Sequence, residues 1–395
     1  MENEAEHAQS SMQNSILTLP SEFQDPIISS ETQMENAQSS AILPTLPSEL
    51  INEILLRLPV KILLRFRSVS KSWLALISTP QFINTHLSLS ANNKDYAHHR
   101  LILSLSGPKE KNLNFCSVRS ILNESVLEPS DLDCPLKDKF QIVGSVNGLI
   151  CLRVGVEPFF IWNPSIRKFK KVTAEAVERY GQKMYGFGYD KLHDDYKILR
   201  MYTTTSNDLK VEIYSLTSDS WRTVDDFPAG RRQCGSAKLV NGKLHWVSSD
   251  SNPWCNQGCI ISFDLADEKW GKLEKPCYRK GEFCNKLGVL GSDLCMFHDY
   301  EKTCADVWIM KEYGVKESWA KIYTINFSHD ISNVWFPLFC KSHKGEFFLA
   351  FRSTFMIYDP KDDSIRYLEV ANSSYCFAED FYFESLVCPF ANDIG

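Results

Sequence analysis

A strand–turn–strand pattern recurs at nearly constant spacing along the chain. Five segments share an apolar strand, a polar turn and a second strand with a bulky anchor residue, and they begin at Phe160, Val211, Ile260, Val307 and Phe355. The anchors are Phe169, Trp221, Trp270, Trp319 and Tyr367, at intervals of 52, 49, 49 and 48 residues. A fixed period of this length is typical of one four-stranded blade of a β-propeller. The phase of the tryptophan anchors predicts that they pack in the core rather than stack on a ligand.

A second strand pair precedes each of these hairpins. Every pair has a Gly, Asn or Asp turn between apolar residues, as at Asn147-Gly148 and Asn241-Gly242. Asn-Gly favours a tight hairpin because both residues tolerate positive φ. Five full units span about 140–370, and strand-like sequence lies on both sides of them, near Arg100 and Tyr382. Pairing these two ends would close a sixth blade and remove exposed edges. We expect an all-β propeller over residues 100–391, with six blades favoured over five or seven.

Residues 44–87 have a different sequence pattern, which predicts short helices. Ser48 is expected to cap a first helix, and its apolar residues recur at helical spacing through Leu58. Pro59 ends that helix and can open the next. Ser70 is expected to cap a third helix that carries Trp73. A module of this size has more apolar residues than its own core can bury, which favours a partner protein.

Two other interpretations of the helical stretch are weaker. A helix-turn-helix DNA reader would suit its net charge of +3, which comes from Arg57, Lys61, Arg65, Arg67 and Lys71 against Glu49 and Glu53. However, no glycine marks a helix–helix turn, and the residues between the basic ones are apolar. A short helical repeat is disfavoured because no second copy follows.

Composition indicates the domain organisation and argues against several classes of protein. Residues 1–43 are polar and are expected to be disordered, and 88–99 are predicted to be a linker with His98 and His99 exposed. Residues 1–45 contain seven acids and no Lys or Arg, so the remaining 350 residues of the −6 chain are close to neutral. This argues against a nucleic-acid binder. No apolar run is long enough for a membrane helix.

Thirteen cysteines occur without a CxxC pair. The start of the chain lacks a positive region and an apolar segment, so no signal peptide is expected. Reduced, buried thiols in the cytoplasm or nucleus are the expectation. Cys255 and Cys259 are the one tight pair, and without a second pair no metal site is predicted. No cofactor is predicted either, because no phosphate-binding loop, GxSxG or HExxH motif occurs.

The helical stretch resembles an F-box. The resemblance rests on Leu46-Pro47, the EIL at Glu53, the RLPVK at Arg57, the RFRSVSKSW at Arg65 and the TPQF at Thr79. It implies docking onto a Skp-type adaptor and, through the adaptor, onto the cullin and RING subunits of a ubiquitin ligase. By matching position, the residues that would form or support this contact are Leu46, Pro47, Ile54, Leu55, Leu58, Pro59, Val60, Leu63, Arg67, Val69 and Trp73.

The strand-rich region resembles the F-box-associated domain that follows plant F-boxes. The carrying motifs are NGLICL at Asn147, IWNPSIRKFKKV at Ile161, YGFGYD at Tyr185 and VEIYSLTSDSWR at Val211. The resemblance implies an α+β multidomain chain, with a small helical F-box followed by a kelch-like propeller. It also implies a non-catalytic substrate receptor of an SCF-type E3 ubiquitin ligase.

The sequence does not identify the target protein. Propellers bind through loops at one end of the ring, and Arg231, Arg232 and Trp254 are the candidate loop residues. An adaptor-binding scaffold that delivers no ubiquitin is an alternative function. A lectin-like or hydrolytic propeller would need convergent carboxylates or histidines on one rim, and none is evident.

Overall fold

The structure is a computed structural model. It describes residues 46–390 apart from 107–110, 137–138, 156, 174–178, 207, 226, 228–231, 234, 250–258, 277–283, 301–303, 328–337, 352–353 and 372–375. The predicted leader, residues 1–43, lies outside the described residues.

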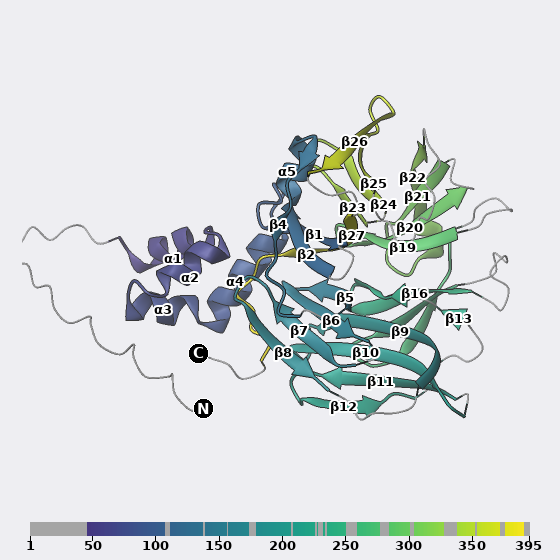
Figure 1. The fold of residues 1–395 in the computed structure, drawn as a ribbon, viewed down its shortest axis with the longest axis horizontal. Coiled ribbons are helices and arrows are strands. Elements are labelled where there is room, and N and C mark those ends of the chain that lie inside the picture. Colours follow the sequence, from purple (N-terminus) through teal and green to yellow (C-terminus); the bar gives the residue numbers. More distant parts are fainter. Residues whose placement is uncertain are drawn as a thin grey trace, which may run out of the picture. The chain divides into compact units, whose positions relative to one another are not determined.

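Four helices form the N-terminal module: α1 (Ser48–Leu56), α2 (Val60–Phe66), α3 (Lys71–Ile77) and α4 (Pro80–Ala91) (Figure 1). The predicted cap at Ser70 is confirmed, since its hydroxyl accepts a hydrogen bond from the Trp73 N–H at 3.1 Å. The predicted cap at Ser48 is wrong, because Pro47 is the N-cap and Ser48 is already helical. Proline suits this place because its fixed φ is extended before the first turn.

The predicted linker begins inside a helix. Helix α4 continues to Ala91, and strand β1 begins at His99. The sequence of this last turn is polar, yet Ser90 and His86 are buried on one side of it. The His86 Nε2–H donates to the Leu58 carbonyl oxygen at 2.9 Å. A polar core contact of this kind gives no hydrophobic periodicity, so the helix end was predicted too early.

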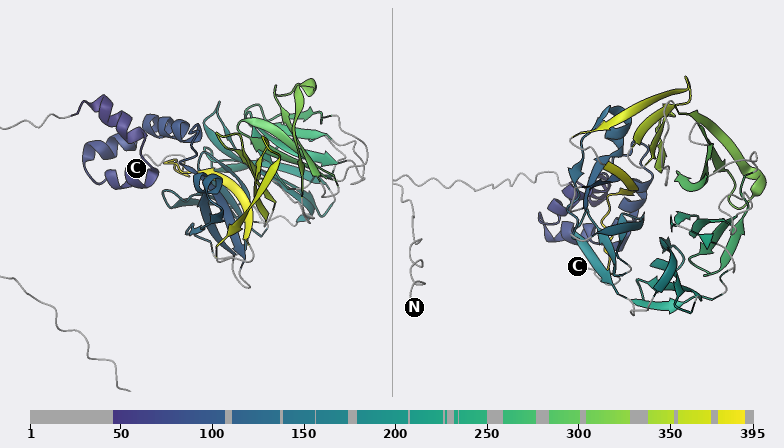
Figure 2. Two further views of the ribbon diagram at one scale, coloured as in Figure 1. Left: turned by 90° about the horizontal axis from the view of Figure 1, so that it is seen from above. Right: turned by 45° about the vertical axis from the view of Figure 1, so that its right-hand side comes forward.

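Six sheets of four or five strands form the second region; they surround a common axis in the right-hand view of Figure 2. The first blade is β5 (Phe140–Val146), β6 (Leu149–Val154), β7 (Phe159–Asn163) and β8 (Lys168–Val172). The second is β9 (Arg179–Asp190), β10 (Asp195–Thr204), β11 (Leu209–Ser215) and β12 (Ser220–Thr223), with β14 (Gly235–Ser236) added parallel to β9. The third is β15 (Lys238–Val240), β16 (Lys243–Ser249), β17 (Ile260–Asp264) and β18 (Trp270–Leu273), with β13 (Arg232–Gln233) paired to β16.

The remaining blades complete the ring. The fourth is β19 (Cys284–Leu290), β20 (Asp293–Tyr300), β21 (Cys304–Met310) and β22 (Trp319–Asn326), with the 3₁₀ turn η1 (Lys316–Ser318). The fifth is β23 (Leu338–Lys341), β24 (Phe347–Phe351), β25 (Thr354–Asp359) and β26 (Ser364–Val370), with β3 (Val126–Leu127) parallel to β26. The sixth is β27 (Cys376–Phe383), β1 (His99–Ser106), β2 (Lys111–Ser117) and β4 (Ser130–Asp131), and α5 (Val118–Asn123) follows β2.

The sixth blade joins the two ends of the propeller sequence. Strand β27 pairs antiparallel with β1, and Arg100 lies opposite Tyr382 in the register. This confirms the predicted divided blade and the predicted count of six. Closing the ring in this way leaves no open end strand between the first and last blades.

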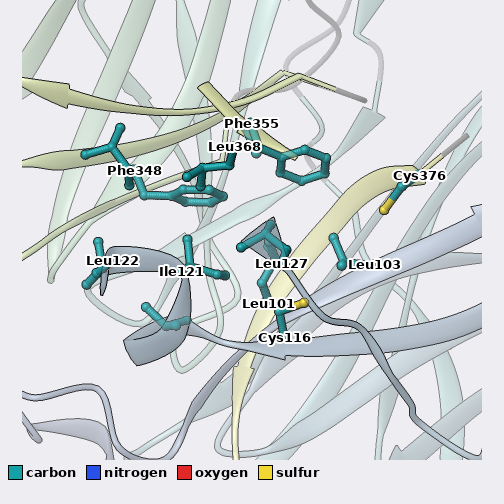
Figure 3. Packing of buried hydrophobic residues seen from close by; sticks show 13 residues of the cluster. Leu101, Leu103, Cys116, Ile121, Leu122, Leu127, Phe348, Phe355, Leu368 and Cys376 are labelled. Carbon is teal, nitrogen blue, oxygen red and sulfur yellow. The ribbon is translucent and has the colours of Figure 1, made fainter. Parts of the chain in front are cut away.

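The core is divided among the six seams between neighbouring blades. One cluster of buried apolar side chains fills each seam. Figure 3 shows the seam between the fifth and sixth blades, where Phe348 and Phe355 face Leu101 and Leu127. Because each blade buries both faces against neighbours, no single blade has a core of its own.

The anchors differ in burial. Trp319 is buried, and Trp221 and Trp270 are half-buried, whereas Phe169 and Tyr367 are 44% and 39% exposed. The indole N–H of Trp221 donates to the Thr173 carbonyl oxygen at 3.1 Å, and that of Trp319 donates to Glu274 O at 2.9 Å. These tryptophans therefore tie the outer strand of one blade to the chain leaving the previous blade, a role that Phe and Tyr rings at the same position do not fill.

Candidate protein-interaction surfaces

Exposed apolar side chains form an apolar row on α1. The row consists of Leu50 and Ile54, which are 46% and 50% exposed and share one face of the helix because they are four residues apart. Leu46, which precedes the helix, is 55% exposed. Val69, just before α3, and Leu74, within α3, are 61% and 42% exposed. An apolar row of this kind on a small module is suited to contact with another protein.

The residues predicted to contact or support an adaptor fall into three classes of burial. Leu46, Pro47, Ile54, Pro59 and Val69 are exposed; Leu58, Arg67 and Trp73 are half-buried; Leu55, Val60 and Leu63 are buried. The buried three belong to one core cluster with Ile77 and Phe82. They can hold the helices in place, but only the exposed and half-buried members can contact a partner directly. Leu50 and Leu74 are equally exposed and were absent from the predicted set.

The half-buried members also build the module. The Trp73 ring packs edge-on against Phe66 with centroids 5.1 Å apart. The carbonyl oxygen of Leu58 accepts the hydrogen bond from His86, whose pKa is lowered mainly by burial. A neutral imidazole is therefore favoured inside the module. Leu58 and Trp73 thus serve the fold as well as any contact.

Basic residues lie around the apolar row. Arg57, Lys61, Arg65 and Lys71 are exposed, and Arg57 pairs with Glu53 one turn away on α1. Exposed pairs of this kind add little stability. Their charge instead favours a partner whose rim is acidic, through faster and better-oriented encounter.

The segment after the last strand packs against both the helices and the first blade. Leu386 is 3% exposed and lies in the core cluster of the helical module, while Val387 lies in the seam between the first two blades. Helix α4 contributes Ile83 and Leu87 to that same seam. We call residues 384–390 the tail. Because these contacts are apolar and buried, the tail fastens the helices to the ring.

The predicted exposure of His98 and His99 is wrong. The ring of His98 lies 5.9 Å from that of His86, and His99 packs against Tyr96 and Phe383. Burial lowers the pKa of His99 to about 4. The Glu384 N–H donates to the His98 carbonyl oxygen at 3.0 Å. The segment before β1 is therefore packed against the tail, which a polar sequence does not reveal.

The two edges of the propeller differ. In each blade, consecutive strands are antiparallel neighbours, and first strands of adjacent blades contact one another around the axis. The turns that join first to second and third to fourth strands therefore share one edge, which we call the turn edge. The tail lies there, since the Ser385 hydroxyl donates to the Asn147 carbonyl oxygen at 2.8 Å in the first such turn. The opposite edge, where second strands connect to third and one blade to the next, we call the loop edge.

The outer turns of the turn edge repeat one local geometry. Asn163, Asp264 and Asp359 each accept, through Oδ1, a hydrogen bond from the N–H two residues on. Four residues after each of them, Arg167, Glu268 and Asp363 have φ of 56°, 55° and 54°. An Asx turn followed by a left-handed residue closes a tight hairpin. These turns explain why the edge that adjoins the tail is compact.

The side chains predicted to contact the substrate lie outside the described part of the chain. Arg231 and Trp254 lie outside the described residues, and of Arg232 only the backbone, at the start of β13, lies within them. Their role in target binding stays a prediction. Among the described residues, no group of three or more His, Cys, Asp or Glu side chains is arranged to hold a metal ion. No described helix is both long and apolar enough to cross a membrane.

The fold joins a small helical module to a β-propeller, an architecture typical of proteins that bind other proteins. Two family profiles match these two parts. An F-box domain profile matches residues 43–85, and the profile of the F-box associated beta propeller domain matches residues 109–388. The second match covers well over half of the chain. The protein belongs to the family of F-box proteins with an F-box associated beta propeller domain.

Curated relatives match along most of both chains. The chain is 33% identical to the F-box/kelch-repeat protein At3g23880 of Arabidopsis thaliana, over 88% of this chain and 96% of that protein. It is 27% identical to the F-box protein CPR1 of the same plant, over 89% and 91% of the two chains. The crystal structure of TolB from Acinetobacter baumannii aligns with a TM-score of 0.45 and 12% identity, over 75% and 71% of the chains. At that score the likeness carries no argument.

Proposed function

We propose that the protein is a substrate receptor of an SCF-type cullin–RING ubiquitin ligase. Its F-box binds a Skp-type adaptor, which connects it to the cullin and RING subunits, and its propeller binds a target protein in the cytoplasm or nucleus. The chain performs no bond chemistry. It contributes proximity, because holding the target near a charged E2 raises the effective concentration of the two reactants.

One observation carries the docking half of this proposal. Leu50 and Ile54 share one face of α1 and are both about half exposed, and apolar side chains of an interface core lose contact with water only when a partner covers them. The F-box match supports a Skp-type adaptor as that partner.

The topology supports the loop edge as the target-binding side. The tail and the helical module pack at the turn edge, against Asn147 and Ile166 of the first blade. The turn edge is thereby partly covered at the first blade. The connections of the loop edge differ in length from blade to blade, and variable connections on a rigid scaffold are where binding residues concentrate.

The adaptor contact is tested by capture of a purified Skp-type adaptor with the full chain. Leu50→Asp combined with Ile54→Asp should abolish capture, whereas Leu89→Asp, at an equally exposed apolar residue on α4, should not. Circular dichroism should show that all variants keep their helices and strands. If the double variant still captured the adaptor as well as the wild type does, the proposed docking surface would be overturned.

Reconstitution of the ligase distinguishes a substrate receptor from a scaffold without ligase activity. The full chain is combined with the adaptor, cullin, RING subunit, E1, E2 and ubiquitin, and with proteins that co-purify with the propeller. Ubiquitin on a co-purifying protein, lost in the double variant, supports the receptor role. Stable complex formation without any ubiquitin transfer would favour the scaffold.

A further inference from the structure

Two buried arginines lie in the seam between the first and second blades. Arg200, on β10, is 2% exposed and pairs with both Glu157 and Glu212. Its guanidinium also lies over the Trp221 ring, 4.2 Å from the centroid. The charge of Arg200 is therefore more than balanced by the protein itself, because two carboxylates pair with one guanidinium.

Arg153 has no carboxylate partner among the residues that the structure describes. It is 8% exposed near the end of β6, and its two hydrogen bonds are to neutral acceptors, the Gly155 carbonyl oxygen and the Gln141 side-chain oxygen. Its Nε is buried without a partner, and no ion pair joins it to a carboxylate among the described residues. Burial lowers the pKa of Arg153. A buried guanidinium without an anion is costly, so it is usually retained for a reason other than folding.

Aromatic rings fix the Arg153 side chain in place. Its guanidinium lies over the Tyr185 ring, 4.2 Å from the centroid. Tyr185 packs against Phe159, and Phe159 packs against Trp221, which lies under Arg200. A stacked guanidinium loses little further freedom when it binds a ligand. The site is thus organised before any ligand arrives.

The position of Arg153 places it toward the loop edge. Strand β6 starts next to the turn at Asn147-Gly148, so its fifth residue, Arg153, is near the opposite end. Gln141 lies directly across from it on β5 and is exposed to solvent. The acceptor that contacts this guanidinium is therefore an exposed, neutral side chain.

We propose that Arg153 anchors an acidic side chain of the bound target. The target carboxylate displaces the Gln141 amide oxygen and forms charge-assisted hydrogen bonds with the guanidinium. This inference rests on the proposed function, because it takes the loop edge as the target-binding side. It adds the chemical class of the target segment: one that presents Asp or Glu.

The chemistry favours a carboxylate over a neutral acceptor at this place. A guanidinium and a carboxylate match in plane and spacing, and hydrogen bonds between charged partners are about twice as strong as those between neutral ones. A glutamine in the same place of the target keeps the shape and loses the charge. We expect an acidic residue to be preferred about tenfold over its amide.

The test is an array of random nine-residue peptides with one fixed central residue, probed with the full chain. The fixed residues are Glu, Gln, Asp, Asn and phosphoserine. Wild type and Gln141→Ala should prefer Glu and Asp over Gln and Asn by about tenfold. Gln141→Glu should lose the preference, because its own carboxylate fills the site. Lys210→Gln, which removes an exposed charge from the β11 end at the same edge, should keep it.

Each result decides the inference. Equal signal for Glu and Gln peptides on the wild type would overturn it, as would an unchanged preference in Gln141→Glu. A stronger preference for phosphoserine than for Glu would reassign the site to phosphate. Adaptor capture by Gln141→Glu should equal that of the wild type, so failure of this inference is distinguishable from failure of the proposed ligase role.

Discussion

The side-chain amide of Asn163 donates hydrogen bonds to the carbonyl and hydroxyl oxygens of Ser385, at 3.0 and 3.2 Å, across 222 residues of sequence. The same amide nitrogen lies 2.8 Å from the Val387 carbonyl oxygen. Asn163 is completely buried. One side chain from the first blade thus satisfies the backbone of the tail that reaches the helices.

Removing that amide should loosen the tail. Asn163→Ala leaves buried carbonyl oxygens of the tail without donors, and we expect the free energy of unfolding to fall by about 2–3 kcal/mol. Urea denaturation of the full chain measures this. Asn123→Ala, at an exposed asparagine on α5, is the matched control and should change stability by less than about 0.5 kcal/mol. Equal effects of the two variants would contradict the role assigned to Asn163.

Leu386 should hold the helical module to the ring. Leu386→Ala removes a buried side chain from the module's core cluster, with an expected loss of about 3 kcal/mol. Because the lost contacts join helices to tail, the helical circular dichroism signal should melt before the sheet signal. Phe390→Ala, at a residue of the tail that is 39% exposed, should leave one transition. A single, unshifted transition in Leu386→Ala would show that the tail does not fasten the helices.

Substitutions at Leu58 and Val69 should have different effects, the first on folding stability and the second on adaptor binding. Leu58 packs in the helical core, so Leu58→Ala is expected to lower the free energy of unfolding by about 2 kcal/mol. Val69 is 61% exposed, so Val69→Ala should leave stability within about 0.5 kcal/mol and weaken adaptor binding by about tenfold. Thermal melts and adaptor titration measure the two effects. A destabilised Val69→Ala, or one with wild-type adaptor affinity, would count against this division.

Lys197 should be essential to the seam between the second and third blades. Its ammonium donates to Asp190 at 2.8 Å, to the Leu265 carbonyl oxygen at 2.6 Å and to Glu268 at 3.1 Å. Lys197→Met leaves the buried Asp190 carboxylate without its cation, at an expected cost of about 3–5 kcal/mol in the free energy of unfolding. Adding Asp190→Asn should recover part of it, because the uncompensated charge is gone. Lys191→Met, at an exposed lysine in the adjoining turn, should not change the free energy of unfolding. The urea midpoint should be lowest for Lys197→Met, intermediate for the double variant and highest for Lys191→Met, and any other order would refute this role of Lys197.

His245 should make the propeller sensitive to acid. The buried imidazole donates from Nδ1 to the Lys238 carbonyl oxygen at 3.2 Å, and its Nε2 accepts from the Tyr313 hydroxyl at 2.7 Å. Burial lowers the pKa of His245 to about 4, whereas an unfolded histidine titrates near 6.5. The unfolded state therefore binds the extra proton first, and the free energy of unfolding falls as pH drops from about 6.5 toward 4, by up to about 3 kcal/mol.

The pH effect is measured by urea unfolding at several pH values between 7 and 4.5. His245→Gln should reduce the loss of stability on acidification, since no proton is taken up at that position. His343→Gln, at an exposed histidine, should leave the wild-type slope. A slope that is the same in all three proteins would show that His245 does not carry the effect.

The repeat spacing predicted the ring because its cause is local. Turns such as Asn147-Gly148, with φ of 54° and 79°, need residues that tolerate positive φ, and those residues are visible in sequence. The pairing of β1 with β27 followed from the need to cover two strand edges. The greater exposure of Phe169 and Tyr367 than of Trp319 was not evident from the spacing, because the repeat gives all five anchors the same place.

The surfaces were predictable only in part. Helical spacing indicated Ile54 and Leu55 together, but only the folded module shows that Ile54 is half exposed while Leu55 is 1% exposed. Nothing in the sequence near Leu386 marks it as a core residue of helices some 300 positions earlier. Arg153 likewise reads as an ordinary charge in a strand. That no carboxylate in the described part of the chain pairs with it emerges only when the first and second blades are side by side.

The pairing of β27 with β1 also constrains how the protein is made. Strand β27 spans Cys376–Phe383, so the ring cannot close until synthesis has passed this strand. Until then β1, translated more than 270 residues earlier, lacks one of its two neighbours. A message cut short anywhere before β27 yields unclosed blades that expose strand edges to chaperones and proteases. Synthesis of β27 is thus required before the propeller can be complete.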